Sequence, residues 1–555
     1  MGIGSDVVTT ARKLNANEAK AFMRALASDP NVEYVEPDVP ISVSMVPNDP
    51  QFGTQWYLHS NLPPENGKVG VRAEPAWDTA TGAGSVIAIV DNGVTSHNDY
   101  NANLLLGQDF VDDRTGKGMN PGNCGGNWHG THVTGIAVAL TNNGNGIAGI
   151  AFGAKAISAR VMNPCGSGFM SDAADGITWA AGGAVPSVPT NNNPATVINL
   201  SLAGSGQCSA TFQNAIDFAT SRGSIVVAGA GNSSADVSGT QPANCHNVIA
   251  VGGTAGIGES YISSNFGPGI DIAAPGNNIW STWDSGNSVP GGDDYRYLSG
   301  TSMSTPMVSG VIALAQSVAP KPLTVAEYRA LLQQSVQPWP APPDRLLGPG
   351  ILDATQAVLA ANSGSVPVAA DFTCSQADGM MQVTCTDRST ARGGVSIASW
   401  SWNLDVVSNP PDMVRTSSVN PYVNYEYPGT YTVRLIVKGA NGATSSVARP
   451  IQVVPPATVA FTANVPTPTS PNQSAFTYYQ MNLPAGLKSL TVSIDGSSPN
   501  GGFLYLKNSP TTINPDCVTH GLPSMSCTVS NPPAGTYYAI YSSSDKAASA
   551  TMTYQ

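Results

Sequence analysis

Charged side chains are scarce in this chain: Asp, Glu, Lys and Arg make up 11% of its 555 residues, and the formal net charge is −12. Nucleic acids and anionic membrane surfaces bind clusters of lysine and arginine, and the sequence contains no such cluster. No segment approaches the roughly eighteen uninterrupted apolar residues that a membrane-spanning helix needs. We therefore expect no nucleic-acid partner and no membrane span.

A secretory signal is also missing, because residues 1–6 have neither a basic start nor an apolar core. If the protein is exported, we expect its true N-terminus to lie outside this sequence. The chain is too long for one hydrophobic core, so several domains are predicted. Its 58 glycines and 43 prolines indicate globular domains with many loops.

The eight cysteines show no Cys-x-x-Cys spacing, and each predicted domain holds an even number of them. Even numbers favour disulfides and an oxidising, extracytoplasmic location over zinc binding, with buried free thiols as the alternative. The last four form two close pairs, Cys374–Cys385 and Cys517–Cys527. Among the three possible pairings of the first four, we choose Cys124–Cys165 and Cys208–Cys245.

A run of small residues surrounds one serine between Leu298 and Gly310. Pro306 follows Ser302 by four positions, and the apolar residues after it have helical spacing. A proline near the start of a helix is predicted to cost nothing, because first-turn amides have no intrahelical partner. Ser302 would then lie at a helix N-terminus, which favours negative charge and suits a nucleophile. Taken alone, the pattern also fits an ordinary helix cap.

Two other segments favour the nucleophile. Val86–Val90 is a continuous apolar run typical of a buried parallel strand, and it ends at Asp91, where open α/β sheets place their sites. His129 lies near the start of a predicted helix of small residues. Asp91, His129 and Ser302 thus follow one another in the chain order of the subtilisin triad.

Four segments resemble those around the triad and the oxyanion hole of subtilisin-like serine proteases: 89–93, 129–133, 300–306 and 227–232. The resemblance implies a subtilisin-like three-layer α/β/α domain with a mainly parallel sheet over residues 46–362. Its opening segment, 47–56, resembles the mature start of thermitase-like members. Apolar runs alternate with helical stretches, as a parallel sheet covered on both faces requires, and we expect strands at 86–90, 156–161, 197–200, 224–228 and 248–251.

The resemblance also assigns the chemistry. Ser302 would be the nucleophile and His129 the general base, with Asp91 fixing the tautomer of the imidazole. Asn232 and the backbone N–H of Ser302 would donate to the oxyanion, with a turn asparagine as the alternative for Asn232. His132 lacks further ligands at metal-binding spacing, so we predict a structural histidine.

Two segments resemble the strands with which the family binds an extended peptide backbone, namely Gly166, Ser167, Gly168 and Ser201, Leu202, Ala203, Gly204. Main-chain pairing does not select side chains, so broad specificity is expected. If Asp236 lined the primary pocket, the enzyme would prefer basic residues in its substrate. We instead expect Asp236 to lie in a loop at the rim of the pocket. His97 and His246 are expected at the surface.

Calcium is the cofactor that the resemblance implies. Asp49 and Asp99 match carboxylates of a structural calcium site in thermitase-like members, and the loop that would complete the site supplies Leu140, Asn143, Asn145 and Ile147. Oxygen ligands from distant segments suit Ca²⁺. A weaker second site is expected at Asp109 and Asp112, where Arg114 stands in place of a further acid and solvated carboxylates are the alternative.

The flanking segments have resemblances of their own. Residues 1–45 resemble the second half of a subtilisin-type propeptide, with a helix expected at 15–26 and a strand at 30–38; a small N-terminal subdomain is the alternative. Residues 366–455, through 399–405 and 425–437, resemble a polycystic-kidney-disease-type (PKD-type) immunoglobulin-like β-sandwich. Residues 457–555 resemble a pre-peptidase C-terminal β-domain. Two all-β domains are therefore expected after the α/β domain.

The sequence thus predicts a secreted, extracellular, calcium-stabilised serine endopeptidase, made as a proenzyme with its own propeptide and acting as a monomer on proteins and peptides. An adhesion or substrate-binding protein with a degraded protease domain is the alternative from another class. The intact Asp91, His129, Ser302 and Asn232 argue against it. A second alternative, an intracellular processing protease, predicts free thiols.

Overall fold

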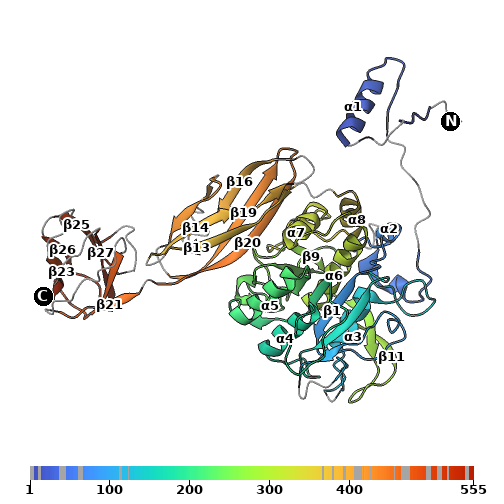
Figure 1. Cartoon of the computed structure of the whole chain (residues 1–555), viewed down its shortest axis with the longest axis horizontal. Coiled ribbons are helices and arrows are strands. Elements are labelled where there is room, and N and C mark those ends of the chain that lie inside the picture. The colour runs from blue at the N-terminus through green and yellow to red at the C-terminus, as the bar shows by residue number, and fades with distance from the viewer. Residues whose placement is uncertain are drawn as a thin grey trace. The chain divides into compact units, whose positions relative to one another are not determined.

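The structure of the chain is a computed structural model, shown in Figure 1. It consists of two units, residues 1–45 and 46–555, which are described separately. It describes residues 6–554 except for 11–13, 15, 37–45, 60–66, 112–115, 123, 365–367, 378–379, 392–394, 405–414, 417, 426–427, 456, 464–475, 496–501, 509–514, 522–523 and 544–548.

In the described part of the first unit, the chain forms the helix α1 (Ala16–Ala27), as the sequence predicts. Glu18 in its first turn and Arg24 in its last turn both complement the helix dipole. The strand expected at 30–38 is wrong for the described residues 30–36, which form turns and extended chain without strand pairing. A strand needs a neighbour for its hydrogen bonds, and the described part of this unit offers none.

A seven-stranded parallel sheet forms the centre of the α/β part of the second unit. In spatial order its strands are β2 (Gln108–Asp109), β3 (Lys155–Arg160), β1 (Val86–Asp91), β4 (Val197–Leu200), β6 (Ile225–Gly229), β8 (Val248–Thr254) and β9 (Ile272–Pro275). All neighbouring pairs are parallel. The five predicted strands are confirmed, because continuous apolar runs mark strands that are buried on both faces.

Helices cover both faces of this sheet (Figure 1). α4 (Met170–Ala180) and α5 (Ala210–Ser221) share a hydrophobic core with Ala88 and Val90 of β1. On the other face, α3 (His129–Val138) packs against α6 (Thr301–Val318), which also contacts β4, β6 and β8. The predicted three-layer α/β/α class is therefore confirmed. None of the helices in the described residues has the length and apolar character needed to cross a membrane.

Shorter elements complete this part of the chain. The hairpin of β10 (Ile279–Asp284) and β11 (Asp293–Leu298) directly precedes α6. The remaining elements are η1 (Phe52–Thr54), η2 (Trp56–Leu58), α2 (Glu74–Trp77), β5 (Gly204–Ser205), η3 (Val237–Gly239), β7 (Thr240–Gln241), α7 (Val325–Gln334) and α8 (Ala354–Asn362).

Antiparallel sheets follow the α/β part. One sheet contains β13 (Phe372–Gln376), β14 (Gln382–Asp387) and β18 (Tyr422–Asn424). Another contains β17 (Arg415–Thr416), β16 (Ile397–Asn403), β19 (Gly429–Gly439) and β20 (Thr444–Val453), and a small one pairs β12 (Val368–Ala369) with β15 (Thr390–Ala391). Val433, Leu435 and Val437 of β19 alternate into a core that includes Trp402. This alternation is the period of two of a strand with one buried face.

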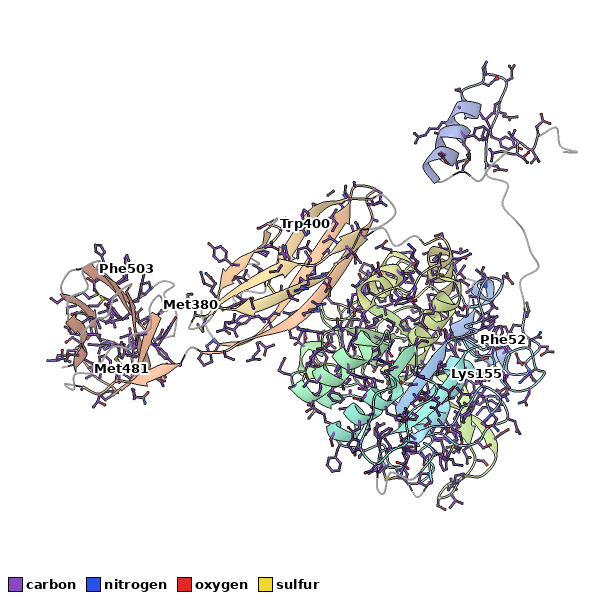
Figure 2. The ribbon with its side chains drawn as sticks, viewed as in Figure 1. Phe52, Lys155, Met380, Trp400, Met481 and Phe503 are labelled. Carbon is purple, nitrogen blue, oxygen red and sulfur yellow. A yellow bond between two sulfur atoms is a disulfide. The ribbon has the colours of Figure 1, made fainter. Side chains whose placement is uncertain are left out.

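The last part of the chain also consists of two sheets around one core. The larger contains β21 (Thr458–Ala460), β22 (Phe476–Leu483), β27 (Gly535–Ser543), β24 (Gly502–Lys507) and β25 (Cys517–Gly521). The smaller contains β26 (Ser524–Ser530), β23 (Ser489–Asp495) and β28 (Ser549–Tyr554). Met481 lies in this core, whereas Phe503 is 47% exposed (Figure 2).

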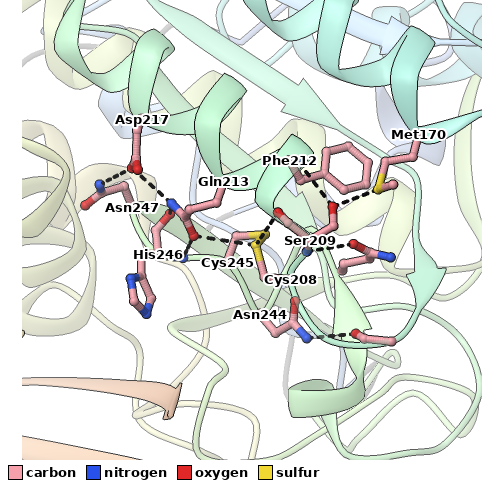
Figure 3. The surroundings of a disulfide bond; sticks show 12 residues. Met170, Cys208, Ser209, Phe212, Gln213, Asp217, Asn244, Cys245, His246 and Asn247 are labelled. Carbon is pink, nitrogen blue, oxygen red and sulfur yellow. Dashed lines mark hydrogen bonds between the residues drawn. A yellow bond between two sulfur atoms is a disulfide. The ribbon is translucent and has the colours of Figure 1, made fainter. Parts of the chain in front are cut away.

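All eight cysteines form the predicted disulfides, Cys124–Cys165, Cys208–Cys245, Cys374–Cys385 and Cys517–Cys527. Cys374 and Cys385 face each other across β13 and β14, and Cys517–Cys527 joins the two sheets of the last part. Figure 3 shows Cys208–Cys245 beside Ser209, whose hydroxyl caps α5 by accepting from Phe212 N–H. Disulfides in every part of the second unit fit an oxidising location.

This pairing makes a prediction about thiols. The protein unfolded in denaturant without reductant will show no free thiol, and after reduction it will show eight per chain. A thiol titration with a chromogenic disulfide reagent measures both values. Several free thiols before reduction would contradict the four bonds and would favour the intracellular alternative.

Candidate active site

Asp91 and His129 form a hydrogen-bonded pair at the carboxyl edge of the parallel sheet. Asp91 is the last residue of β1 and is fully buried, and His129 is the first residue of α3. His129 Nδ1 lies 2.9 Å from Asp91 Oδ1 and 3.0 Å from Oδ2. The imidazole keeps 23% of its side-chain exposure. The carboxylate therefore holds the ring from one side while the ring stays accessible to solvent.

Close backbone contacts fix the start of α3 against the end of β1. Gly130 N donates to Asn92 Oδ1 at 3.0 Å, and Asn92 N donates to Asp91 Oδ1 at 2.7 Å. A Cβ at position 130 would lie only 2.3 Å from the carbonyl oxygen of Gly93. Glycine at position 130 is therefore required by the close approach of two backbones, and this approach keeps His129 within reach of Asp91.

The carboxylate sets the protonation of the imidazole. Burial lowers the pKa of His129, but the charge of Asp91 and its hydrogen bond together raise it by more, so the pKa lies above its usual value. A carboxylate only accepts hydrogen bonds, so Nδ1 carries the proton in the neutral ring. The lone pair of Nε2 is then the basic site of His129.

Ser302 is the second residue of α6, as the sequence predicts. The cap residue Gly300 has a φ of 153°, and a Cβ there would lie 3.3 Å from Asn232 Nδ2. Asn232 Oδ1 accepts hydrogen bonds from Thr301 N at 2.9 Å and from Thr301 Oγ1 at 3.2 Å. These bonds fix the oxygen, and no hydrogen bond of the described residues engages Asn232 Nδ2, so its two N–H donors are left for a ligand and the oxyanion role stays a prediction.

Strand register brings Ser302 to the Asp91–His129 pair. β1 and β4 are parallel neighbours in which Val90 lies opposite Leu200, so Asp91 and Ser201 come next to each other at the end of the sheet. Ser201 Oγ donates to the carbonyl oxygen of Ser302 at 2.9 Å. Ser302 is thus linked through Ser201 to the sheet edge that carries Asp91 and His129, and a catalytic triad of the three residues stays a prediction.

The hydroxyl of Ser302 has a different partner from the expected one. It donates to the carbonyl oxygen of Ser201 at 3.3 Å, and no hydrogen bond among the described residues joins it to His129. The bond to Ser201 is long, and a serine hydroxyl rotates readily between acceptors. Catalytic hydrogen bonds are often incomplete before substrate binds, so this geometry is compatible with His129 as the base for Ser302.

The position of Pro306 in its helix also differs from the prediction. It is the sixth residue of α6 and lies beyond the first turn. The expectation that it costs nothing is wrong, because an N–H at position 306 would donate to the carbonyl of Ser302 in an α-helix.

The residues predicted to bind substrate lie on two exposed segments near this edge. Gly204 belongs to β5 and pairs with Gln241 of β7. Gly168 forms a bridge with Met162, whose neighbour Val161 donates its N–H to the carbonyl of Asp91 at 2.9 Å. Solvent reaches most of the two segments, since the exposed residues are Gly166, Ser167, Gly168, Ala203 and Gly204. Leu202 is half-buried.

The other histidines do not take part in this site. His132 is buried, and its Nε2 lies 3.0 and 3.1 Å from two carbonyl oxygens of the β10–β11 hairpin. Burial lowers the pKa of His132 to about 3, so this structural histidine is neutral, as predicted. His246 is exposed, as expected. The surface expectation for His97 is wrong, because aromatic rings from two segments leave it only 1% exposed.

The residues of the predicted calcium site converge on one loop. Asp49 accepts from Asn142 N at 2.7 Å and from Asn143 N at 3.1 Å, and Asp99 Oδ2 accepts from Ile147 N at 2.8 Å. Asp99 Oδ1 is buried without a hydrogen-bond partner, and burial raises the pKa of Asp99 to about 7.

An unpaired, buried carboxylate oxygen beside a second carboxylate fits a hard cation such as Ca²⁺. No group of three His, Cys, Asp or Glu side chains suited to a metal occurs in the described part of the chain. A cation held by Asp49 and Asp99 would therefore take further ligands from carbonyl and amide oxygens of the loop, including those predicted at Leu140, Asn143 and Asn145.

At the second, weaker calcium prediction, an arginine contacts the carboxylate. Asp109 is buried, and its Oδ2 accepts from Arg160 Nε at 2.7 Å and lies 2.6 Å from Arg160 Nη2. Asp112 and Arg114 lie outside the described residues. The positive charge next to Asp109 is therefore that of Arg160. The second calcium site stays a prediction.

Fold and site together define a class of protein: an α/β protein whose parallel sheet carries Asp, His and Ser, in that chain order, at its carboxyl edge. Residues 82–356 match the model of the Subtilase family. Thermitase from Thermoactinomyces vulgaris is 41% identical over 272 residues, and the match covers 49% of this chain and 85% of thermitase. The chain belongs to the subtilase family.

Longer relatives extend the similarity. The "Extracellular protease" of Xanthomonas campestris is 45% identical over 386 residues, which are 66% of this chain and 65% of that protein. The "Extracellular basic protease" of Dichelobacter nodosus is 40% identical over 387 residues, 64% of this chain and 63% of that protein. The chain thus spans just under two thirds of these relatives. A solved protease structure from Pseudoalteromonas arctica is 41% identical, with a TM-score of 0.54, and the match covers 57% of this chain and 99% of that one.

The Asp91–His129 pair makes a prediction about pH. Asp91→Asn will move the titration of the His129 ring to lower pH, because the charge that raises its pKa is lost while the burial that lowers it remains. NMR of the imidazole protons in a Ser302→Ala background measures the shift. The exposed Asp344→Asn is the matched control and will leave the titration in place. An unchanged titration in Asp91→Asn would contradict the pairing.

Proposed function

We propose that this protein is a serine endopeptidase that hydrolyses peptide bonds in proteins through an acyl-enzyme. The observation that carries the proposal is the 2.9 Å bond between Asp91 and His129 at the sheet edge that also holds Ser302. A neutral serine is a weak nucleophile, and a paired imidazole is the base that activates it. Membership of the subtilase family supports the same reaction.

The residues have separate roles in this reaction. Ser302 Oγ attacks the carbonyl carbon of the peptide while His129 Nε2 takes the hydroxyl proton. Asp91 stabilises the imidazolium that results, in line with the raised pKa of His129. Asn232 Nδ2 and Ser302 N–H donate to the oxyanion. His129 then gives its proton to the leaving amine as the peptide bond breaks. In the second half of the reaction His129 takes a proton from water, the water oxygen attacks the acyl carbon, and the proton passes to Ser302 Oγ as the ester bond breaks and the acid product leaves.

The substrate would lie extended between the two exposed segments. The backbones of Gly166, Ser167 and Gly168 on one side and of Ser201, Leu202, Ala203 and Gly204 on the other would pair with the peptide backbone. Such pairing reads no side chains, so broad specificity follows. Asp236 caps η3 by accepting from Ser238 N at 2.8 Å, which supports a loop role rather than a pocket role.

The flanking segments fit a secreted enzyme. Two relatives are named extracellular proteases, and the disulfides suit the same location. We propose that residues 1–45 are the second half of a propeptide, that 46–362 are the catalytic domain, and that the enzyme is a monomer. Residues 366–455 would be a PKD-type domain and 457–555 a pre-peptidase C-terminal domain, a proposal that their β-sheets support.

Calcium would stabilise the catalytic domain. Asp49 and Asp99 would hold the ion with oxygens of the loop 140–147. The positive charge of the ion would offset the free-energy cost of burying the Asp99 carboxylate next to that of Asp49. The ion would link residues near position 49 to a loop almost a hundred positions later in the sequence. It would act on stability and take no part in the reaction.

Casein hydrolysis tests the enzymatic function. The wild type will hydrolyse casein, and Ser302→Ala will lower turnover by about a millionfold, as loss of the nucleophile does in subtilisin. Ser304→Ala, a buried serine two positions along the same helix, is the control and will retain most of the activity. Equal, negligible activity in the wild type and Ser302→Ala would favour the adhesion or substrate-binding alternative.

Removal of calcium tests the metal proposal. In the Ser302→Ala background, which prevents autolysis, chelation will lower the unfolding temperature by about 5 °C or more, because bound ligand stabilises the native state. Asp99→Asn will remove most of this difference, whereas the exposed Asp344→Asn will keep it. An unfolding temperature that is the same with calcium and with chelator would contradict the site.

A further inference from the structure

The carbonyl group of Ser302 lacks the donor that an α-helix normally gives it. In an α-helix each carbonyl accepts a hydrogen bond from the N–H of the residue four positions later. For Ser302 that residue is Pro306, which has no N–H. Buried backbone carbonyls are nearly always paired. In this protein the donor comes from outside the helix, because Ser201 Oγ donates to Ser302 O at 2.9 Å.

A chain of buried polar groups fixes the direction of this bond. Ser309 Oγ donates to Asn199 Oδ1 at 2.9 Å, and Asn199 Nδ2 donates to Ser201 Oγ at 3.0 Å. Ser201 is 4% exposed, and Asn199 and Ser309 are fully buried. Because Ser201 Oγ accepts from the amide, its own proton is free to go to the carbonyl of Ser302. Each hydrogen bond in this chain therefore has a defined donor and acceptor, from Ser309 through Asn199 and Ser201 to the carbonyl of Ser302.

We propose that Ser201 is a positioning residue for the nucleophile, with Asn199 and Ser309 holding its hydroxyl in place. A residue with an N–H at position 306 would tie Ser302 only to its own helix. Because Pro306 has no N–H, the carbonyl of Ser302 can accept the hydrogen bond from Ser201. Ser201 directly follows β4, and β4 pairs with β1, the strand that ends at Asp91. The start of α6 is thereby bonded to the sheet that carries the Asp91–His129 pair.

The same residue also holds the reacting group at rest. Ser302 Oγ donates to the carbonyl of Ser201 at 3.3 Å, so Ser201 contacts Ser302 at both its carbonyl and its hydroxyl. The hydroxyl of Ser201 acts on the backbone of Ser302 and leaves the backbone of the proposed substrate strand unchanged. Its loss should therefore lower kcat and leave KM nearly constant. This consequence rests on the proposed peptidase function.

A double-mutant cycle tests the proposal in the active enzyme. Ser201→Ala will lower kcat for a peptide amide by about tenfold, the size expected for one lost hydrogen bond, with KM within about twofold. In a Pro306→Ala background the new N–H of residue 306 supplies the missing donor, so Ser201→Ala will change kcat by less than about threefold. An equal loss in both backgrounds would overturn the proposal.

Unfolding temperatures of the same cycle in a Ser302→Ala background give a readout that needs no activity. Ser201→Ala will lower the unfolding temperature with proline at position 306 and will lower it much less with alanine there. Ser224→Ala is the matched control, because Ser224 is buried and its hydroxyl donates to the carbonyl of Ala195 at 2.7 Å. Its effect will be equal in both backgrounds.

The two measurements separate the possible failures. A wild type no more active than Ser302→Ala would refute the peptidase function, and the unfolding cycle would still decide whether Ser201 replaces the missing donor. An active wild type with additive effects in both cycles would leave the function standing and refute the role of Ser201.

Discussion

The buried carboxylate of Asp91 is the group on which the rest of the site depends. It belongs to the last residue of β1, has no exposed surface, and lies within hydrogen-bonding distance of His129 Nδ1 through both of its oxygens. A buried charge is costly unless it is paired and hydrogen-bonded. The first turn of α3 meets this need through His129 and the close approach at Gly130. The same contacts therefore stabilise the buried carboxylate and orient His129, the proposed base.

Ser302, the proposed nucleophile, reaches the same sheet edge by a different route. Continuous apolar strands place β4 beside β1, and Ser201, which follows β4, bonds to the carbonyl and the hydroxyl of Ser302. Pro306 makes this possible by removing a hydrogen bond from the helix that carries Ser302. Proline, which usually disrupts helices, thus allows one helical carbonyl to accept a hydrogen bond from a residue next to the sheet. Thr301 N–H fixes the side-chain oxygen of Asn232, the proposed oxyanion donor.

Much of the fold and the site could be predicted from local signals. Apolar runs mark the buried strands, and short motifs around Asp91, His129 and Ser302 identify three residues that lie far apart in the chain. Contacts between distant segments left no such signal. The burial of His97, the bond between Asp109 and Arg160 and the Ser309–Asn199–Ser201 chain all depend on which elements pack against each other. The missing strand in the first unit has a related cause, because pairing depends on a partner that local sequence does not reveal.

The central claim is that Ser302 is activated by His129 at the edge of this sheet. Labelling with a fluorophosphonate, followed by mass mapping of peptides, tests it directly, because the reagent phosphonylates activated serines. The account predicts one label per chain, located on Ser302, and a labelling rate that falls by orders of magnitude in His129→Ala. Labelling of another serine, or a rate that does not depend on His129, would contradict it.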